Sequence, residues 1–164
     1  MSGLGTLIAA CAPLVAPATA HALVHQESGG HQFAIGVVDA RLERQARSMA
    51  EALATVRQLE VEGMNYSVGL AQINRSNFAR LGLTAQTAFE PCANLQAMQV
   101  ILGECFERAS RKASEQQALR MALSCYYSGN FQTGFRHGYV TSVVNAWRAQ
   151  TESRQQQERR SRTD

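Results

Sequence analysis

The sequence predicts a mainly α-helical protein with at most a short β-hairpin. Of its 164 residues 45% are apolar, and the helix formers Ala, Leu, Gln and Arg are abundant, whereas runs of β-branched residues are scarce. Apolar side chains also recur every three or four residues in several segments, which is the period of an amphipathic helix. The length is that of one domain and is sufficient to bury a core.

Apolar periodicity and capping residues predict where the helices lie. Pro17 suits the first position of a helix, where its missing N–H costs nothing. Ser48 followed by Glu51 has the pattern of a capping box, and the helix that it begins should end before Gly63. Thr84 is expected to start one further turn. The expected helices are about 5–11, 17–28, 49–62, 75–81, 91–112, 115–128 and 140–147.

The remaining segments are expected to be loops, short strands and a polar tail. Residues 29–42 are predicted to form a loop with a short extended piece at 33–38, and residues 65–74 a loop or short strand that passes into a turn. From Gln150 onward the chain is too polar to fold alone. We therefore expect a folded domain over 1–149 and a disordered tail over 150–164.

Charge and the N-terminal segment bear on the partners of the chain. A net charge of +3 is too small to indicate nucleic-acid binding, but it suits an anionic polymer such as a cell wall. The apolar segment 4–20 ends in Ala18-Thr19-Ala20, which resembles a signal-peptide cleavage site. No Lys or Arg precedes it and two prolines interrupt it, so we expect it to be part of the fold. It is also too short and too broken to insert stably in a membrane.

The four cysteines show no spacing typical of a metal site, so zinc is not expected. Cys92 and Cys105 lie thirteen residues apart in one predicted helix, or about 20 Å, too far for a disulfide between them. Of the two remaining arrangements we prefer Cys11–Cys92 with Cys105–Cys125; four buried free thiols are the alternative. Disulfides would indicate an oxidising compartment.

Glu27 is the candidate catalytic residue. An apolar helical run carries it to the end of the 17–28 helix, where Gly29 and Gly30 stop the helix, since glycine enters the left-handed conformation without steric cost. A carboxyl group there would lie partly out of water beside a space built from loops. Burial disfavours its charged form, so it can donate a proton at neutral pH and take one back. An exposed Glu at a helix end is the alternative.

Several short motifs accompany Glu27 along the chain in a definite order. The segments are Cys11–Pro13, Gly69–Asn74, Pro91–Leu95, Ser124–Asn130 and Gly134–Val143. This order resembles the family 1 lytic transglycosylases, which have a lysozyme-like helical fold, and most of all the small transglycosylases of type IV secretion and conjugation systems. The resemblance covers about residues 7–147. Tyr127 departs from it, because the family usually has Asn after the Tyr at position 126.

The resemblance implies that Glu27 is the only catalytic acid and base in a peptidoglycan lytic transglycosylase. Such an enzyme cleaves the bond between N-acetylmuramic acid and N-acetylglucosamine and leaves a 1,6-anhydro end. The expected substrate-binding residues are polar, aromatic or glycine: Ser28, Tyr66, Gly69, Gln72, Asn74 and Tyr126. No cofactor or metal is expected, although three histidines, at 21, 25 and 31, lie near Glu27 in the sequence.

The expected partners are glycan strands of the wall and components of a type IV secretion or conjugation apparatus in the periplasm. Two other functions stay open. One is a hydrolytic muramidase, and the other is a wall-binding assembly factor without activity.

Overall fold

The computed structural model describes residues 3–163, which divide into two compact units. The first unit consists of residues 3–13 and 27–98, and the second of residues 14–26 and 99–163. Two helices, α2 (Pro17–Ser28) and α5 (Pro91–Ser110), contribute residues to both. The prediction of a mainly helical fold is confirmed, and the small sheet has three short strands, one more than a hairpin.

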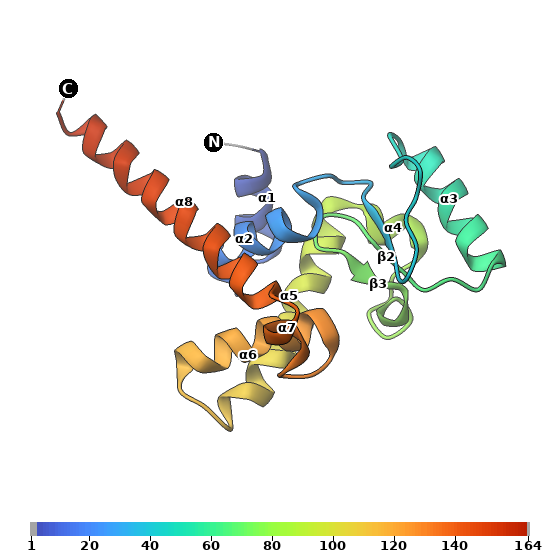
Figure 1. Ribbon diagram of the computed structural model, residues 1–164. Helices are drawn as coiled ribbons and strands as arrows, with labels where there is room; N and C mark the ends of the chain where they lie inside the picture. Colours follow the sequence, from blue (N-terminus) through green and yellow to red (C-terminus); the bar gives the residue numbers. More distant parts are fainter. Residues whose placement is uncertain (1–2, 164) are drawn as a thin grey trace. The chain divides into compact units, whose positions relative to one another are not determined.

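Figure 1 shows short helices and a small sheet in the first unit. The sheet is antiparallel, with the strand order β1-β2-β3. Besides its parts of α2 and α5, the unit contains, in chain order, α1 (Gly3–Cys11), β1 (Ile35–Val37), α3 (Met49–Val61), β2 (Tyr66–Val68), β3 (Ile73–Asn74), the 3₁₀ helix η1 (Arg75–Asn77) and α4 (Ala85–Phe89). In the register of the sheet, Ile35 pairs with Val68, and Val68 in turn pairs with Ile73. Three apolar side chains of neighbouring strands therefore lie side by side.

The core of the first unit forms where helix α3 and the end of α4 meet the sheet. Ala52, Val56 and Leu59 are buried on one side of α3, at the three- and four-residue spacing that the sequence shows. They belong to one apolar cluster with Ile35, Ala46, Tyr66, Val68, Ala88 and Phe89. The sheet is thus covered by the helices that follow its strands in the chain.

The predicted cysteine pairing is confirmed. Cys11 at the end of α1 is bonded to Cys92 in the first turn of α5, with the Cα atoms 5.2 Å apart. Cys105 in α5 is bonded to Cys125 in α6 (Glu115–Ser128), with the Cα atoms 5.8 Å apart. Each bridge lies within one unit.

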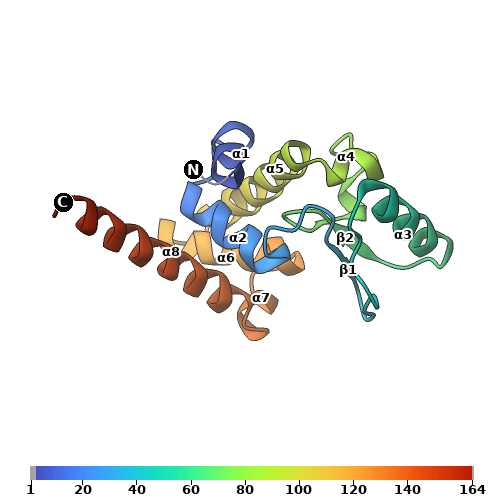
Figure 2. The same cartoon turned by 90° about the horizontal axis from the view of Figure 1, so that it is seen from above.

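In the second unit, α6 packs with α7 (Thr133–Arg136) and α8 (Tyr139–Ser161) (Figure 2). Gly134 allows α7 to approach α6 closely, because a Cβ atom there would lie 2.5 Å from the Cα of Ser124. The Ser124 hydroxyl accepts a hydrogen bond from Gly134 N–H at 2.9 Å and donates one to the Asn130 carbonyl at 2.9 Å. Ser124 thereby fixes both the turn after α6 and the helix that follows it.

Several predicted helix bounds were wrong. Residues 75–81 form the three-residue helix η1 followed by turns, because so short a segment before Gly82 does not repay the cost of nucleating an α-helix. Helix α8 does not end near residue 147 but continues to Ser161. Its Gln, Glu and Arg residues are good helix formers, and extending an existing helix costs little. The boundary between a folded domain and a tail at 149/150 stays a prediction.

The capping box of α3 is only half formed. The Ser48 hydroxyl accepts a hydrogen bond from Glu51 N–H at 3.2 Å, as predicted. The Glu51 carboxylate instead accepts from the backbone N–H of Arg47 at 2.8 Å and pairs with Arg44 at 3.2 Å. A complete capping box occurs at α4, between Thr84 and Thr87.

Candidate active site

Glu27 lies in the last turn of α2, as predicted. The helix ends at Ser28, and Gly29 and Gly30 follow with φ of 62° and 85°, values that favour glycine. The Glu27 side chain is half-buried. The two glycines therefore end the helix one residue after Glu27, so that its carboxyl group lies at the helix end.

Ser28 joins the end of α2 to the loop that follows strand β2. Its hydroxyl donates a hydrogen bond of 2.7 Å to the Leu70 carbonyl and accepts one of 3.1 Å from Gly30 N–H. The residue directly after Glu27 is therefore bonded to the 69–74 segment. Two motifs that lie about forty residues apart in the sequence meet here.

The loop after β2 is held by Asn94, a residue that the sequence did not single out. Asn94 is fully buried, and its amide donates to the carbonyls of Val68 at 2.9 Å and Ala88 at 2.7 Å. Its Oδ1 accepts from Ala71 N–H at 2.8 Å. Gly69 has a φ of 83°, and a Cβ atom there would clash with the Asn94 amide. Asn94 lies within the Pro91–Leu95 motif, which was the one feature of the sequence that pointed to it.

Gln72 spans from the loop to strand β1. Its backbone is left-handed, with a φ of 51°, which is uncommon for a residue other than glycine. Its side-chain amide donates to the carbonyls of Ala34 at 3.0 Å and Gly69 at 3.2 Å. A Cβ atom on Gly36 would lie 2.6 Å from Gln72 Oε1, so a larger residue there would displace the Gln72 amide. One amide hydrogen of Gln72 thus ties the loop to the residue before β1, and the other closes the loop on itself.

Tyr66 and Asn74 lie in the two strands that flank the loop. Tyr66, which was expected to bind substrate, is fully buried in the core instead. Its hydroxyl donates to the Glu60 carboxylate at 2.7 Å, and burial, followed by this carboxylate, raises the pKa of Tyr66. The Asn74 side chain accepts from Ser76 N–H at 3.1 Å and caps η1, and it donates to the Tyr66 carbonyl at 3.2 Å.

The structure brings five of the predicted residues together in the first unit. Glu27 and Ser28 lie at the end of α2, and Gly69, Gln72 and Asn74 lie in and after the loop that Ser28 contacts. Tyr126 is half-buried on α6 in the second unit, and its role stays a prediction.

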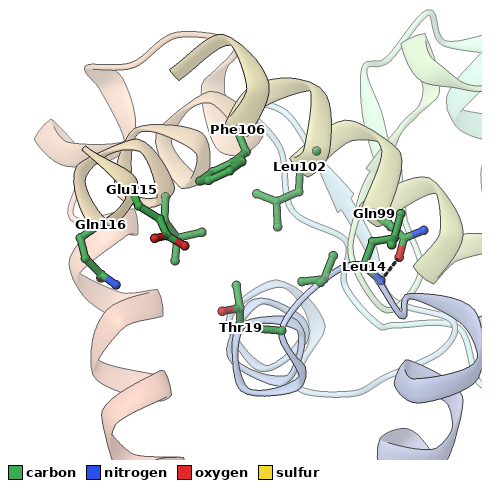
Figure 3. A pocket seen from close by; sticks show the side chains of 11 residues that line it. Leu14, Thr19, Gln99, Leu102, Phe106, Glu115 and Gln116 are labelled. Atoms are coloured by element: carbon green, nitrogen blue, oxygen red, sulfur yellow. Dashed lines mark hydrogen bonds between the residues drawn. The ribbon is translucent and has the colours of Figure 1, made fainter. Parts of the chain in front are cut away.

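A cavity of about 320 Å³ lies within the second unit and is lined by none of the predicted residues (Figure 3). Thr19 of α2, Leu102 and Phe106 of α5, and Glu115 and Gln116 of α6 point toward it.

Among residues 3–163 no group of three His, Cys, Asp or Glu side chains is placed to hold a metal ion. In the same part of the chain, no helix combines the length and apolar character that crossing a membrane requires.

The fold and the site define a class. A mostly helical chain with a small antiparallel sheet, and a glutamate at the end of a helix beside a glycine-containing loop, belongs to the lysozyme-like proteins. The family model described as "Transglycosylase SLT domain" matches residues 6–146. The chain therefore belongs to the transglycosylase SLT domain family.

Two curated relatives illustrate the similarity. The type IV secretion system protein virB1 of Brucella suis biovar 1 (strain 1330) is 50% identical over 141 residues, which cover 82% of this chain and 59% of that protein. Protein virB1 of Agrobacterium fabrum (strain C58) is 35% identical over 136 residues, which cover 83% of this chain and 56% of that protein. The chain thus spans less than two thirds of the length of these relatives. No solved structure matches it.

Proposed function

We propose that this chain is a peptidoglycan lytic transglycosylase domain in which Glu27 is the catalytic acid and base. The observation that carries the proposal is the position of Glu27. It is half-buried in the last turn of α2, next to the Ser28 contact with Leu70, in a chain of the transglycosylase SLT domain family. The rigid loop beside it supports a fixed position for a bound glycan strand.

A single carboxyl group is sufficient for this chemistry. Glu27 in its acid form donates a proton to the oxygen between N-acetylmuramic acid and N-acetylglucosamine, and the bond from that oxygen to muramyl C1 breaks. The carbonyl oxygen of the substrate's own N-acetyl group stabilises the positive charge at C1. The Glu27 carboxylate then takes the proton of the muramyl C6 hydroxyl, whose oxygen bonds to C1. The 1,6-anhydro ring forms, Glu27 regains its proton, and no water is consumed.

The surrounding residues divide into two roles under this proposal. Ser28, Gly69 and Gln72 hold the loop at the helix end, where backbone groups can approach a sugar closely. Asn74 supports that loop through its hydrogen bonds with Tyr66 of β2 and Ser76 of η1. Tyr126 is the residue of the second unit that we assign to the substrate, because the family motif places a tyrosine there.

The biological setting belongs to the same proposal. The relatives named above are virB1 proteins, one of them described as a type IV secretion system protein. We infer that the chain acts in the periplasm and opens the wall locally for a secretion or conjugation apparatus. The oxidising environment of that compartment agrees with the two disulfides.

Digestion of purified sacculi followed by mass spectrometry of the soluble fragments tests the reaction. We expect muramic ends in the 1,6-anhydro form, and Glu27→Gln should reduce their release by about a thousandfold or more, because the amide keeps the shape but cannot shuttle a proton. Glu43→Gln is the matched control, since Glu43 is an exposed carboxyl group in the same unit.

Each other result has a definite meaning. Reducing muramic ends would assign a hydrolytic muramidase instead. Cleavage by the Glu27→Gln variant at the parent rate would contradict the role of Glu27. Wall binding without any cleavage by the parent protein would favour the assembly factor.

A further inference from the structure

The second unit contains two adjoining cavities that the proposed reaction does not use. The first cavity, of about 320 Å³, is the one in Figure 3, and the second cavity, of about 360 Å³, is lined mainly by α2, α6 and α8. Cavities of this size are typical of sites for small molecules. The two adjoin because they share five lining residues: Ala16, Thr19, Glu115, Gln116 and Leu119.

Most residues that line the two cavities are apolar. Leu102 and Phe106 of α5 line the first cavity, and Leu123 of α6 and Val143 of α8 line the second. Trp147, the only tryptophan of the chain, also lines the second cavity and is 41% exposed. An apolar chain in the cavities would remove these surfaces from water, which favours its binding.

Thr19, which lines both cavities, has a hydroxyl group without a hydrogen-bond partner. The residue is only 7% exposed, and Figure 3 shows its side chain pointing toward the first cavity. Within residues 3–163 no group forms a hydrogen bond with this hydroxyl. Hydroxyl groups so deeply buried usually have a partner, because leaving water costs free energy. The Thr19 hydroxyl is thus available to a molecule bound in the cavities.

Two arginines give the second cavity its positive charge. Arg120 of α6 is half-buried, Arg148 of α8 is exposed, and both line the second cavity alone. In the described part of the chain neither guanidinium has an ion-pair or hydrogen-bond partner. Glu115 is exposed and is the one acidic residue among the described residues that line the cavities. The place for an anionic group is therefore beside the two arginines.

We propose that the two cavities together form a binding site for a medium-chain fatty acid. Its carboxylate pairs with Arg120 and Arg148 and accepts a hydrogen bond from Thr19, and its alkyl chain extends into the first cavity. A purely apolar ligand would leave the arginines and the hydroxyl unpaired, and a small inorganic anion would leave the apolar walls in water. An amphiphile with one chain satisfies both. Glu27 lines neither cavity, so the site is independent of the proposed reaction.

Trp147 makes this binding measurable in the full chain. Titration with sodium decanoate, below the concentration at which it forms micelles, should shift the tryptophan emission saturably to shorter wavelength. Octanoate should bind about tenfold more weakly, because it buries two methylene groups fewer. 1-Decanol should bind about fivefold more weakly than decanoate, because it cannot pair with the arginines. Decanol binding as tight as that of decanoate would reveal unspecific apolar partition and would overturn the site.

Matched variants test the residues that hold the carboxylate. Arg120→Gln and Arg148→Gln should each weaken decanoate binding about fivefold, because a charge-assisted hydrogen bond is lost. Arg159→Gln is the control, since Arg159 is an exposed arginine of α8 that lines neither cavity. Equal effects of all three substitutions, or no saturable change with decanoate in the parent, would overturn the proposal.

Thr19→Val separates a ligand contact from a structural role. Valine keeps the shape and removes an unpaired hydroxyl, so the Tm of the ligand-free protein should stay the same or rise. Decanoate binding should nevertheless weaken about threefold, because one hydrogen bond to the carboxylate is lost. A lower Tm together with unchanged binding would show that the hydroxyl serves the fold and not a ligand.

The binding site and the proposed enzyme fail in different ways. Glu27→Gln should bind decanoate as the parent does. Cleavage of sacculi without decanoate binding would remove the site and keep the enzyme, and decanoate binding without cleavage would do the reverse.

Discussion

A few single residues fix the backbone at the candidate site. Asn94 is buried with all of its amide hydrogens and its carbonyl oxygen in hydrogen bonds to the backbone of the 68–71 segment and of Ala88. Such a group is stable in a core only because its partners replace water. Gly69 and Gln72 both have a positive φ in this segment. The loop next to Ser28 therefore has one well-defined conformation before any substrate arrives.

Tyr66→Phe measures what the buried hydroxyl contributes. The ring stays in the core, but the 2.7 Å hydrogen bond to the Glu60 carboxylate is lost. We expect the free energy of unfolding at neutral pH to fall by about 1–2 kcal/mol, the usual range for a hydrogen bond to a charged group that is partly in water. Urea unfolding followed by circular dichroism checks this, with Tyr127→Phe as the control for loss of a surface hydroxyl.

The same variant should change how stability depends on pH. Burial and the neighbouring carboxylate raise the pKa of Tyr66 in the folded state above the unfolded value of about 10. This contribution to stability is therefore complete below about pH 10 and is lost as the pH rises toward the folded pKa. Between pH 9 and pH 11 the parent should lose more stability than Tyr66→Phe. Parallel curves in the two proteins would contradict the assignment.

At the scale of the elements, glycine has opposite effects at different positions of the helices. Gly103 lies inside α5 with ordinary helical backbone, and a Cβ atom there would meet nothing within 4 Å. Gly129 ends α6 with a φ of 79° and likewise has open space around it. Space is equal at the two sites, so backbone conformation alone distinguishes them.

The pair Gly103→Ala and Gly129→Ala tests this difference. Gly103→Ala should stabilise the fold by about 0.5–1 kcal/mol, because alanine loses less chain entropy in a helix. Gly129→Ala should destabilise it by about 1 kcal/mol, because alanine is strained in the left-handed region. Thermal unfolding of both variants beside the parent is sufficient. Changes of the same sign would show that the helix end at Gly129 does not persist in solution.

At the scale of the whole molecule, two disulfides close loops of different length. Cys11–Cys92 joins residues 81 positions apart, and Cys105–Cys125 joins residues 20 positions apart. Closing a longer loop removes more entropy from the unfolded chain. Each bridge also ties α5 to a neighbouring helix, α1 in the first unit and α6 in the second.

Removing each bridge separately should show which one contributes more to the free energy of unfolding. From loop length, Cys11→Ala with Cys92→Ala should cost about 4–5 kcal/mol of stability, and Cys105→Ala with Cys125→Ala about 3 kcal/mol. Denaturant unfolding under oxidising conditions gives both values, and the reduced parent protein provides the reference for loss of both bridges. A greater loss from the shorter loop would mean that the chain-entropy account does not apply here.

Local patterns predicted most of the elements. Apolar spacing with Pro17, Ser48, Pro91 and Gly129 gave the starts or ends of α2, α3, α5 and α6 within a few residues. The short helix α7 and the full length of α8 were not predicted, and the helix expected over 75–81 is only the three-residue 3₁₀ helix η1. The place of α7 depends on the contact of Ser124 with Gly134, which joins residues that no periodic pattern connects.

The candidate site shows the same division. The sequence by itself determined the helix that carries Glu27 and its end at two glycines, because these follow from the rules of single helices. Distance along the chain excluded a Cys92–Cys105 bridge, and the structure decided between the remaining arrangements. Only the tertiary structure decided that Tyr66 lies in the core, that Gln72 spans to β1 and that Asn94 holds the loop. The physical reason is that a polar side chain takes its role from the partners that folding brings to it, and those partners lie up to about forty residues away in the chain.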